Sequence, residues 1–375
     1  MAKADPSHDL EKVFNNFRIY GDYVDANLYG SGHINDTYLL EVQQSGRPVK
    51  YIVQRLNNVA FPDPLGLMDN VKRITEHLQK KLRAAGDPDA SRKAMTVILT
   101  NDDKACYVEN GNYWRCYLFV ENAIGHDIIL NDDQAFEAAK AFGDFQKLLV
   151  DLPGERLVET IPNFHNTPKR FEKFEQVLAE DKFDRAKDVQ PQIDFIMARK
   201  DDAYKLLDLN AKGLIPERIT HNDTKLNNVL LDVETEKATC VIDLDTSMPG
   251  LALYDFGDMI RTSTSPAAED ELDLSKVQVQ MNMFEALVKG YLSTAAEFLT
   301  PTELDNLAFS GKLLTLECSI RFLTDYLEGD IYFRIHHEGH NVERCKTQHA
   351  LVERIEEKLE EMDKIVKAEF ARITG

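Results

Sequence analysis

The sequence predicts an α+β protein with two lobes, a small, mostly antiparallel sheet lobe over residues 1–121 and a large, mostly helical lobe over residues 122–375. Three observations support this prediction. At 375 residues the chain is too long for one small core. Strand-like runs separated by turn residues fill most of the first lobe. Apolar residues spaced three and four apart, interrupted by prolines, dominate the second lobe.

The first lobe is expected to contain a short opening helix, several strands and one longer helix. Leu10, Val13 and Phe14 have helical spacing within residues 7–16. An amphipathic pattern over residues 67–84 predicts the longer helix, and glycines between the first two strand-like runs predict a hairpin. The strands are expected at 24–28, 37–42, 50–55, 94–99, 105–109 and 113–120.

In the second lobe, long helical patterns flank a short region of strands. Helices are expected over residues 132–150 and 168–210 before this region. They resume after Tyr254, over about 268–298, 301–328 and 342–372. The short strands are expected at 217–220, 229–232 and 239–243.

Composition excludes several classes of function. The net charge of −20, from 44 basic and 64 acidic residues, would repel nucleic acid and anionic membranes. Five scattered cysteines without a CxxC pair indicate neither a zinc site nor a disulfide framework. No signal peptide and no membrane-spanning run is apparent. We expect a soluble cytoplasmic protein, a monomer or weak homo-oligomer, whose partner is a small molecule.

Two polar stretches, each beside apolar strand-like runs, carry the candidate chemistry. They are Thr220-His221-Asn222-Asp223-Thr224-Lys225-Leu226-Asn227-Asn228 and Ile242-Asp243-Leu244-Asp245. Phosphoryl transfer needs a carboxylate to orient the attacking hydroxyl, a cation on the phosphate and oxygen ligands for magnesium. Asp223 suits the first task, Lys225 the second, and Asn228 with Asp243 the third. Turn formation by Asn and Asp is the alternative interpretation of these residues.

The first stretch resembles the catalytic loop of the protein-kinase-like fold, H-x-D-x-x-x-x-N, with a lysine two residues after the aspartate. Asp243 stands where that fold's DFG aspartate holds metal, but Leu244 and Asp245 replace the phenylalanine and glycine. This departure is similar to the small-molecule kinase family of aminoglycoside phosphotransferases and choline kinases. Further segments look like bacterial N-acetylhexosamine 1-kinases. They are Gly32-His-Ile-Asn35, Ala141-Phe-Gly-Asp-Phe-Gln146, Met248-Pro-Gly250, Asp255-Phe-Gly-Asp258 and the run from Arg321 to Tyr332.

The resemblance implies ATP- and Mg²⁺-dependent phosphorylation of the anomeric C1 hydroxyl of N-acetylglucosamine or N-acetylgalactosamine. Asp223 would then be the base, Lys225 would contact the transferred phosphate, and Asn228 and Asp243 would bind magnesium. Two alternatives stay open. One is the same chemistry on an aminoglycoside, choline, ethanolamine, homoserine or methylthioribose. The other is a catalytically silent kinase fold that binds a sugar or a protein.

The nucleotide-binding side matches the wider fold less well. Gly30 and Gly32 are expected in a loop over the phosphates, although Asn35 stands where its third glycine would be. On the third strand, Gln54 occupies the register of the usual phosphate-binding lysine, and Arg55 is expected to point to the other face. The usual lysine–glutamate pair is therefore expected to be absent or altered, which leaves Glu76 solvated.

The remaining candidate site residues follow from the resemblance. The backbone around Phe119 and Glu121, at the end of the sheet lobe, would bind adenine as a kinase hinge does. His33, Arg321 and Tyr332, together with Asp223, would contact the sugar. A turn histidine that only meets solvent, and an Arg321–Glu317 pair four residues apart, are the alternatives. Asp255 and Asp258 are expected to be structural, capping a helix and bracing the catalytic loop.

Overall fold

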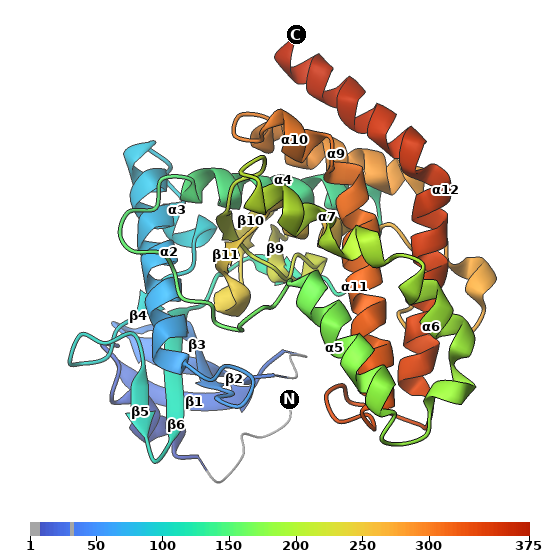
Figure 1. The fold of residues 1–375 in the computed structure, drawn as a ribbon. Helices are drawn as coiled ribbons and strands as arrows, with labels where there is room; N and C mark the ends of the chain where they lie inside the picture. Colours follow the sequence, from blue (N-terminus) through green and yellow to red (C-terminus); the bar gives the residue numbers. More distant parts are fainter. Residues whose placement is uncertain (1–7, 31–33) are drawn as a thin grey trace.

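The computed structural model describes residues 8–30 and 34–375. A twisted sheet with one long helix beside it forms one side of the molecule, and most helices gather on the other side (Figure 1). This arrangement confirms the predicted α+β fold with an antiparallel N-terminal sheet and a mostly helical remainder. The proposed lobe boundary at residue 121 lies between β6 (Asn112–Leu118) and β7 (Ala123–Gly125).

Within the described residues, six antiparallel strands form the N-terminal sheet, in the order β1-β2-β3-β6-β4 with β5 paired to β6. The predicted strands and helices are present, but β4 is shorter than predicted and a short α3 precedes it. The other elements are α1 (Leu10–Phe14), β1 (Asp22–Leu28), β2 (Asp36–Gln44), β3 (Arg47–Leu56), α2 (Pro64–Ala84), α3 (Ala90–Lys93), β4 (Val97–Ile98) and β5 (Tyr107–Glu109).

Turn chemistry and burial explain the sheet. Ser45 and Gly46 both have positive φ, 51° and 81°, as a tight two-residue hairpin between β2 and β3 requires. One face of the sheet packs on α1 through buried side chains such as Tyr38 and Leu40. The other face meets α2, whose Val71 and similar apolar residues are fully buried. The sheet is thus covered on both faces.

The second lobe begins with β7, which pairs with β9, and continues mainly as helices. Its helices are α4 (Asp132–Leu149), α5 (Thr167–Glu180), α6 (Gln190–Met197), α7 (Lys200–Ala211), α8 (Ala252–Ser263), α9 (Met281–Ala295), α10 (Pro301–Leu304), α11 (Leu307–Leu327) and α12 (His340–Thr374). Its strands are β8 (Arg218–Thr220), β9 (Val229–Asp232), β10 (Ala238–Val241) and β11 (Met248–Gly250). Short 3-10 helices are Ala186–Asp188, Leu226–Asn228, Leu244–Thr246 and Leu274–Lys276.

Several boundaries differ from the prediction in this lobe. The stretch 168–210 is three helices, because α5 ends where Asp181 adopts a left-handed conformation and Pro191 helps to start α6. The stretch 268–298 is α-helical only from Met281, and α8 precedes it. Strands β7 and β11 are too short to leave a period-two pattern, so the sequence did not indicate them.

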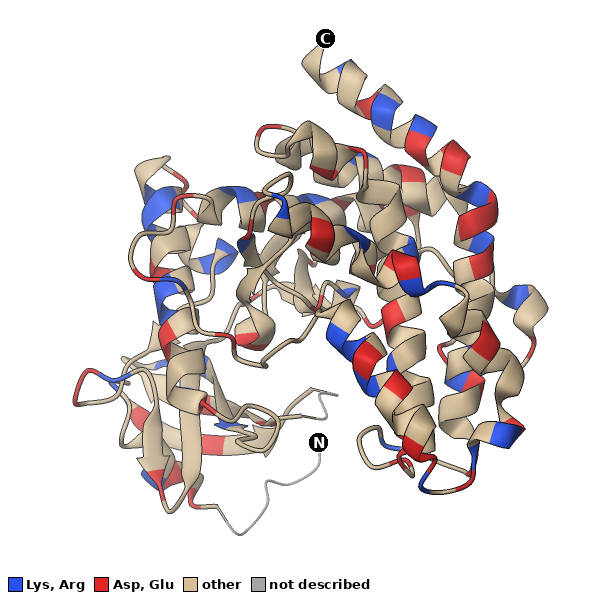
Figure 2. Cartoon of the chain, viewed as in Figure 1, with Lys and Arg blue, Asp and Glu red and all other residues tan. Residues whose placement is uncertain are grey.

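The short strands position the two polar stretches in the second lobe, next to the N-terminal sheet. The first stretch joins β8 to β9, and the second follows β10. Helix α8 packs against β8, and α11 packs against α8, within one large apolar core. Lys and Arg are interspersed with Asp and Glu along the outer helices α5 and α12 (Figure 2). Among the described residues, no helix has both the length and the apolar composition needed to cross a membrane.

Candidate functional site

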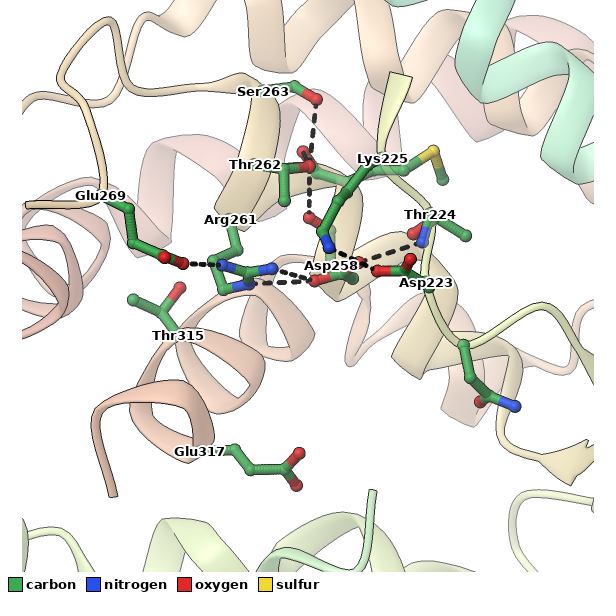
Figure 3. Close-up of polar contacts among 12 residues, drawn as sticks. Asp223, Thr224, Lys225, Asp258, Arg261, Thr262, Ser263, Glu269, Thr315 and Glu317 are labelled. Atoms are coloured by element: carbon green, nitrogen blue, oxygen red, sulfur yellow. Dashed lines mark hydrogen bonds and ion pairs between the residues drawn. The ribbon is translucent and has the colours of Figure 1, made fainter. Parts of the chain in front are cut away.

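The loop between β8 and β9 brings Asp223, Lys225 and Asn228 into contact. Lys225 Nζ lies 2.9 Å from one carboxylate oxygen of Asp223 (Figure 3). The side-chain amide of Asn228 donates to the other carboxylate oxygen at 3.0 Å and to the Asp223 carbonyl at 2.7 Å. Both oxygens of the candidate base are therefore held, one by a cation and one by an amide.

These contacts set the charge state of the pair. Burial would raise the pKa of Asp223, but Lys225 and the Asn228 amide outweigh burial and lower it. Burial would lower the pKa of Lys225, but the neighbouring carboxylates of Asp223 and Asp258 raise it. Asp223 is thus an ionised carboxylate and Lys225 an ammonium at neutral pH. The carboxylate can accept a proton, and the ammonium beside it can bind an anion.

Asp243 follows β10 in the left-handed conformation, with φ 57°. Desolvation, together with the nearby carboxylates of Asp245 and Asp223, raises the pKa of its carboxyl to about 6 against the opposing charge of Arg115. Among the described residues, neither the Asp243 carboxylate nor Asn228 Oδ1 accepts a hydrogen bond. Two unengaged hard oxygen donors, one of them beside other negative charges, fit the ligand preference of Mg²⁺.

Hydrogen bonds connect the two polar stretches directly. His221 Nε2 lies 2.9 Å from the carbonyl of Ile242. Thr246 Oγ1 donates to the His221 carbonyl at 2.7 Å, and the Asn222 amide donates to the Thr246 carbonyl at 2.9 Å. The loop that carries Asp223 and the turn that carries Asp243 therefore form one rigid unit. Within the described residues, no cluster of three or more His, Cys, Asp or Glu side chains is arranged to hold a metal.

Helix α8 braces the catalytic loop from behind. Asp255 is fully buried and accepts hydrogen bonds from the backbone N–H groups of His221 and Asn222, at 2.9 and 2.7 Å. Asp258 accepts from the Thr224 N–H at 3.0 Å and also pairs with Arg261 (Figure 3). The predicted bracing role is confirmed. The predicted capping role is wrong, because the N-cap of α8 is Leu251.

On the nucleotide-binding side, Gly30 is described and has φ 82°, a value that favours glycine. Gly32 and His33 lie outside the described residues. Gln54 bonds to Thr37 Oγ1 at 2.8 Å and accepts from Arg115 Nε at 2.9 Å. Arg55 instead pairs with Asp36 within the sheet.

Glu76 on α2 is exposed, as predicted. Among the described residues, its one ion-pair partner is Lys72, whose Nζ lies 3.9 Å from the Glu76 carboxylate. No lysine–glutamate pair of the usual kind therefore joins β3 to α2 in the described part of the chain. The cation nearest to Gln54 is an arginine of the neighbouring strand, Arg115.

The proposed hinge has some backbone groups already engaged. The N–H of Phe119 donates to the Lys50 carbonyl at 3.1 Å, and the carbonyl of Glu121 accepts from Arg92 at 3.0 Å. In the described residues, the Phe119 carbonyl and the Glu121 N–H make no such bond. One acceptor and one donor thus remain for an adenine edge.

Arg321 on α11 and Tyr332, which follows this helix, lie together. The Arg321 guanidinium lies 5.4–5.8 Å from the ring centres of Phe164, Tyr332 and Phe333. The alternative Arg321–Glu317 pair is not formed. Glu317 is buried and binds His165 at 2.8 Å and Thr167 at 2.6 Å.

Two cavities adjoin the catalytic loop. One, of about 200 Å³, includes Lys225, Arg261 and Gln348 in its lining. The buried Gln348 Oε1 has no hydrogen-bond partner among the described residues. The other, of about 150 Å³, is lined in part by His165 and Asn222. Both cavities are small beside a typical ligand pocket of ~300–1,000 Å³.

Sequence reasoning missed one buried ion pair next to the site. Arg115 on β6 and Asp245 are 1% and 2% exposed, and both guanidinium Nη atoms donate to the Asp245 carboxylate. The signal in the sequence was a lone arginine inside an otherwise apolar strand. Asp245 was noted only as a replacement for a glycine, so no partner was assigned to either residue.

Comparisons with known proteins identify the family of the chain and match its fold. A family model described as the phosphotransferase enzyme family matches residues 25–286. An aminoglycoside phosphotransferase from Alicyclobacillus acidocaldarius superposes with a TM-score of 0.61 at 11% identity, covering 98% of each chain. A spectinomycin phosphotransferase in complex with ADP and spectinomycin gives 0.54 at 13% identity, covering 97% of this chain and 99% of the other. A choline kinase from Cryptosporidium parvum gives 0.53 at 15% identity, covering 96% and 99%.

Proposed function

The chain belongs to the phosphotransferase enzyme family, and from this premise we propose that it transfers the γ-phosphoryl group of ATP to the anomeric C1 hydroxyl of an N-acetylhexosamine. The products are the sugar 1-phosphate and ADP. The observation that carries the proposal is the contact set of Asp223, whose ionised carboxylate is held between Lys225 and Asn228 beside Asp243.

The chemistry follows from these four side chains. Asp223 accepts the proton of the C1 hydroxyl as the hydroxyl oxygen bonds to phosphorus and the bond to the ADP oxygen breaks. An anomeric hydroxyl is more acidic than an ordinary alcohol, so a carboxylate whose pKa is lowered remains a sufficient base. Lys225, kept protonated, neutralises charge on the transferred group. Asn228 and Asp243 would hold Mg²⁺, which would supply charge neutralisation on the phosphate oxygens.

The nucleotide is assigned to the side of the catalytic loop that is nearest to the N-terminal sheet. The free Phe119 carbonyl and Glu121 N–H would bind the adenine edge. Gly30 and Gly32 would lie over the phosphates, near Gln54. One structural neighbour, the spectinomycin phosphotransferase, was solved with ADP, which supports a nucleotide as the phosphoryl donor.

The acceptor is assigned to the side of Arg321 and Tyr332, with His33 from the opposite lobe. A guanidinium without a carboxylate partner in the described residues can donate to an acetamide carbonyl or to sugar hydroxyls. It would also repel a cationic acceptor, which argues against an aminoglycoside, choline or ethanolamine. The resemblance of the motifs to hexosamine kinases supports the sugar, and the structural neighbours support only the fold.

An acceptor screen tests the proposal. Purified protein with Mg²⁺ and ATP is assayed for ADP release with N-acetylglucosamine, N-acetylgalactosamine, choline, ethanolamine and an aminoglycoside. Release with an N-acetylhexosamine, and NMR coupling of phosphorus to the anomeric proton of the product, would support the assignment. Turnover only with an amino alcohol or an aminoglycoside would refute the sugar. Tight MgATP binding without ADP release for any acceptor would instead indicate a silent binding protein.

A further inference from the structure

Three residues that depart from the protein-kinase pattern meet in one network. Asn35 stands at the place of the third loop glycine, Gln54 at the place of the strand lysine, and Asp245 at the place of the DFG glycine. Asn35 Nδ2 donates to Asp245 at 2.7 Å, and Arg115 links Gln54, at 2.9 Å, to the same carboxylate. The three departures are therefore parts of a single arrangement centred on Arg115.

The Arg115–Asp245 pair joins the two lobes through the interior. Arg115 belongs to β6 of the N-terminal sheet and contacts Met68 Sδ of α2 at 3.8 Å. Asp245 belongs to the turn that begins at Asp243. Both Nη groups of the arginine donate to the carboxylate, the second at 3.0 Å, and both side chains are almost completely buried. A bidentate pair of this kind fixes orientation as well as distance.

The turn that contains Asp243 is thus held from two sides. From the helical lobe, Asn222 and His221 bond to Thr246. From the sheet, Arg115 and Asn35 bond to Asp245. Without Arg115, the repulsion between the buried carboxylate of Asp245 and the more exposed carboxylate of Asp243 would lose the positive charge that offsets it.

Asn35 extends the network toward the proposed nucleotide loop. Its side-chain oxygen accepts from the Asn57 N–H at 2.9 Å, while its amide binds Asp245. A glycine at this position could make neither bond. The start of β2, which follows the expected nucleotide-binding segment along the chain, is consequently tied to the turn that carries the candidate metal ligand.

We propose that Arg115 is a positioning residue that joins the N-terminal sheet to the turn that carries the candidate metal ligand Asp243. Through Asp245 it orients Asp243 for the metal–nucleotide complex, and through Asn35 it couples that turn to the nucleotide loop. The inference rests on the proposed function only in requiring that MgATP binds here. It does not depend on the identity of the acceptor.

Calorimetry of ADP binding, with and without Mg²⁺, tests this role without any acceptor. Arg115→Gln is expected to weaken MgADP binding by about 10- to 100-fold, the usual loss when a residue that orients a metal ligand is removed. Metal-free ADP binding should change far less. Arg55→Gln is the matched control, because Arg55 lies on the adjacent strand and pairs with Asp36 inside the sheet. It should stay within about twofold of wild type.

A rescue variant separates positioning from mere stability. Gln54→Lys combined with Arg115→Gln returns a cation to the third strand, across the β3–β6 pair, and should recover part of the lost MgADP affinity. Asn35→Gly, which removes only the loop connection, should weaken MgADP binding in a protein that still folds. Equal effects of Arg115→Gln on ADP with and without Mg²⁺ would overturn the inference, as would no effect of Asn35→Gly. Failure of the wild type to bind MgADP would overturn the proposed function as well. Absence of sugar turnover in a protein that binds MgADP would refute the proposed acceptor and leave this inference standing.

Discussion

The backbone N–H of Asn222 donates a hydrogen bond of 2.7 Å to the buried carboxylate of Asp255. Asn222 precedes the candidate base and has φ 66°, a conformation that few residues other than glycine adopt freely. Asp255 also accepts from Gln146 at 2.6 Å, so its charge is shared among three donors. The position of Asp223 thus depends on a residue of α8 that touches no substrate in the proposed mechanism.

Asp255→Ala should destabilise the protein and slow turnover. It leaves two buried N–H groups without an acceptor, at about 1–3 kcal/mol each, and frees the loop that holds Asp223. Urea unfolding gives the loss of stability, and kcat measured on the folded fraction gives the loss of positioning. Asp305→Ala, at an exposed acid of the same lobe, should change stability by no more than ~0.5 kcal/mol. Equal changes in stability and in kcat for the two variants would contradict the bracing role of Asp255.

Asp223→Asn should lower kcat by roughly 10²–10⁴-fold, the usual contribution of a positioned base. The amide has nearly the same shape and can still meet Asn228, so the fold and nucleotide binding should persist. Steady-state ADP release and calorimetry with MgADP measure the two effects separately. Turnover close to that of wild type would remove Asp223 from the role of base.

Asp243→Asn should raise the Mg²⁺ concentration needed for half-maximal nucleotide binding. The substitution removes the only charged member of the proposed ligand pair, and hard divalent cations prefer carboxylate oxygens. Titration of Mg²⁺ at fixed ADP, followed by calorimetry, measures the shift. Removal of the metal with EDTA should lower nucleotide binding by the wild type to that of the variant. A variant with unchanged Mg²⁺ dependence would show that the metal binds elsewhere.

His165→Gln should weaken the pH dependence of stability. Burial lowers the pKa of His165, but the ion pair and hydrogen bond with Glu317 outweigh burial and raise it above 6.5. Glu317 shows the opposite shift, since His165 and Thr167 overcome burial and lower its pKa below 4.5.

The directions of these two pKa shifts define the pH range in which the pair stabilises the fold. The histidine's contribution is complete below its unfolded pKa of about 6.5 and is lost as pH rises through its folded pKa. The glutamate's contribution is present above about 4.5 and is lost as pH falls through its folded pKa. Unfolding free energy of the wild type should therefore decline from ~pH 6 toward alkaline pH more steeply than that of His165→Gln. Parallel profiles would show that the pair does not titrate in this range.

Arg321→Met should raise KM for the sugar and leave KM for ATP near its wild-type value. A hydrogen bond from a charged group contributes about 1.5–3 kcal/mol, which corresponds to roughly 10- to 100-fold in KM. Arg334→Met is the control, because Arg334 is exposed in the same segment as Tyr332. Initial-rate kinetics with each substrate varied in turn give both constants. If both variants give the same sugar KM, Arg321 does not bind the acceptor.

Local patterns were sufficient for most elements of the fold. Apolar spacing predicted α2 and α4 to within a few residues, and the strand runs predicted the sheet. Where the prediction failed, the cause was local conformation that periodicity does not record. The left-handed Asp181 that ends α5 and the very short β7 and β11 are examples.

The sequence by itself determined the order of the elements and the composition of the catalytic loop, because Asp223, Lys225 and Asn228 are close along the chain and one short loop must bring them together. Only the tertiary structure decided what holds that loop and its neighbouring turn. Arg115 and Asp245 are separated by 130 positions, and Asp255 reaches Asn222 across 33. Periodicity shows which face of an element is buried, but not which distant side chain that face contacts. The partner of a buried charge is found only in the folded structure.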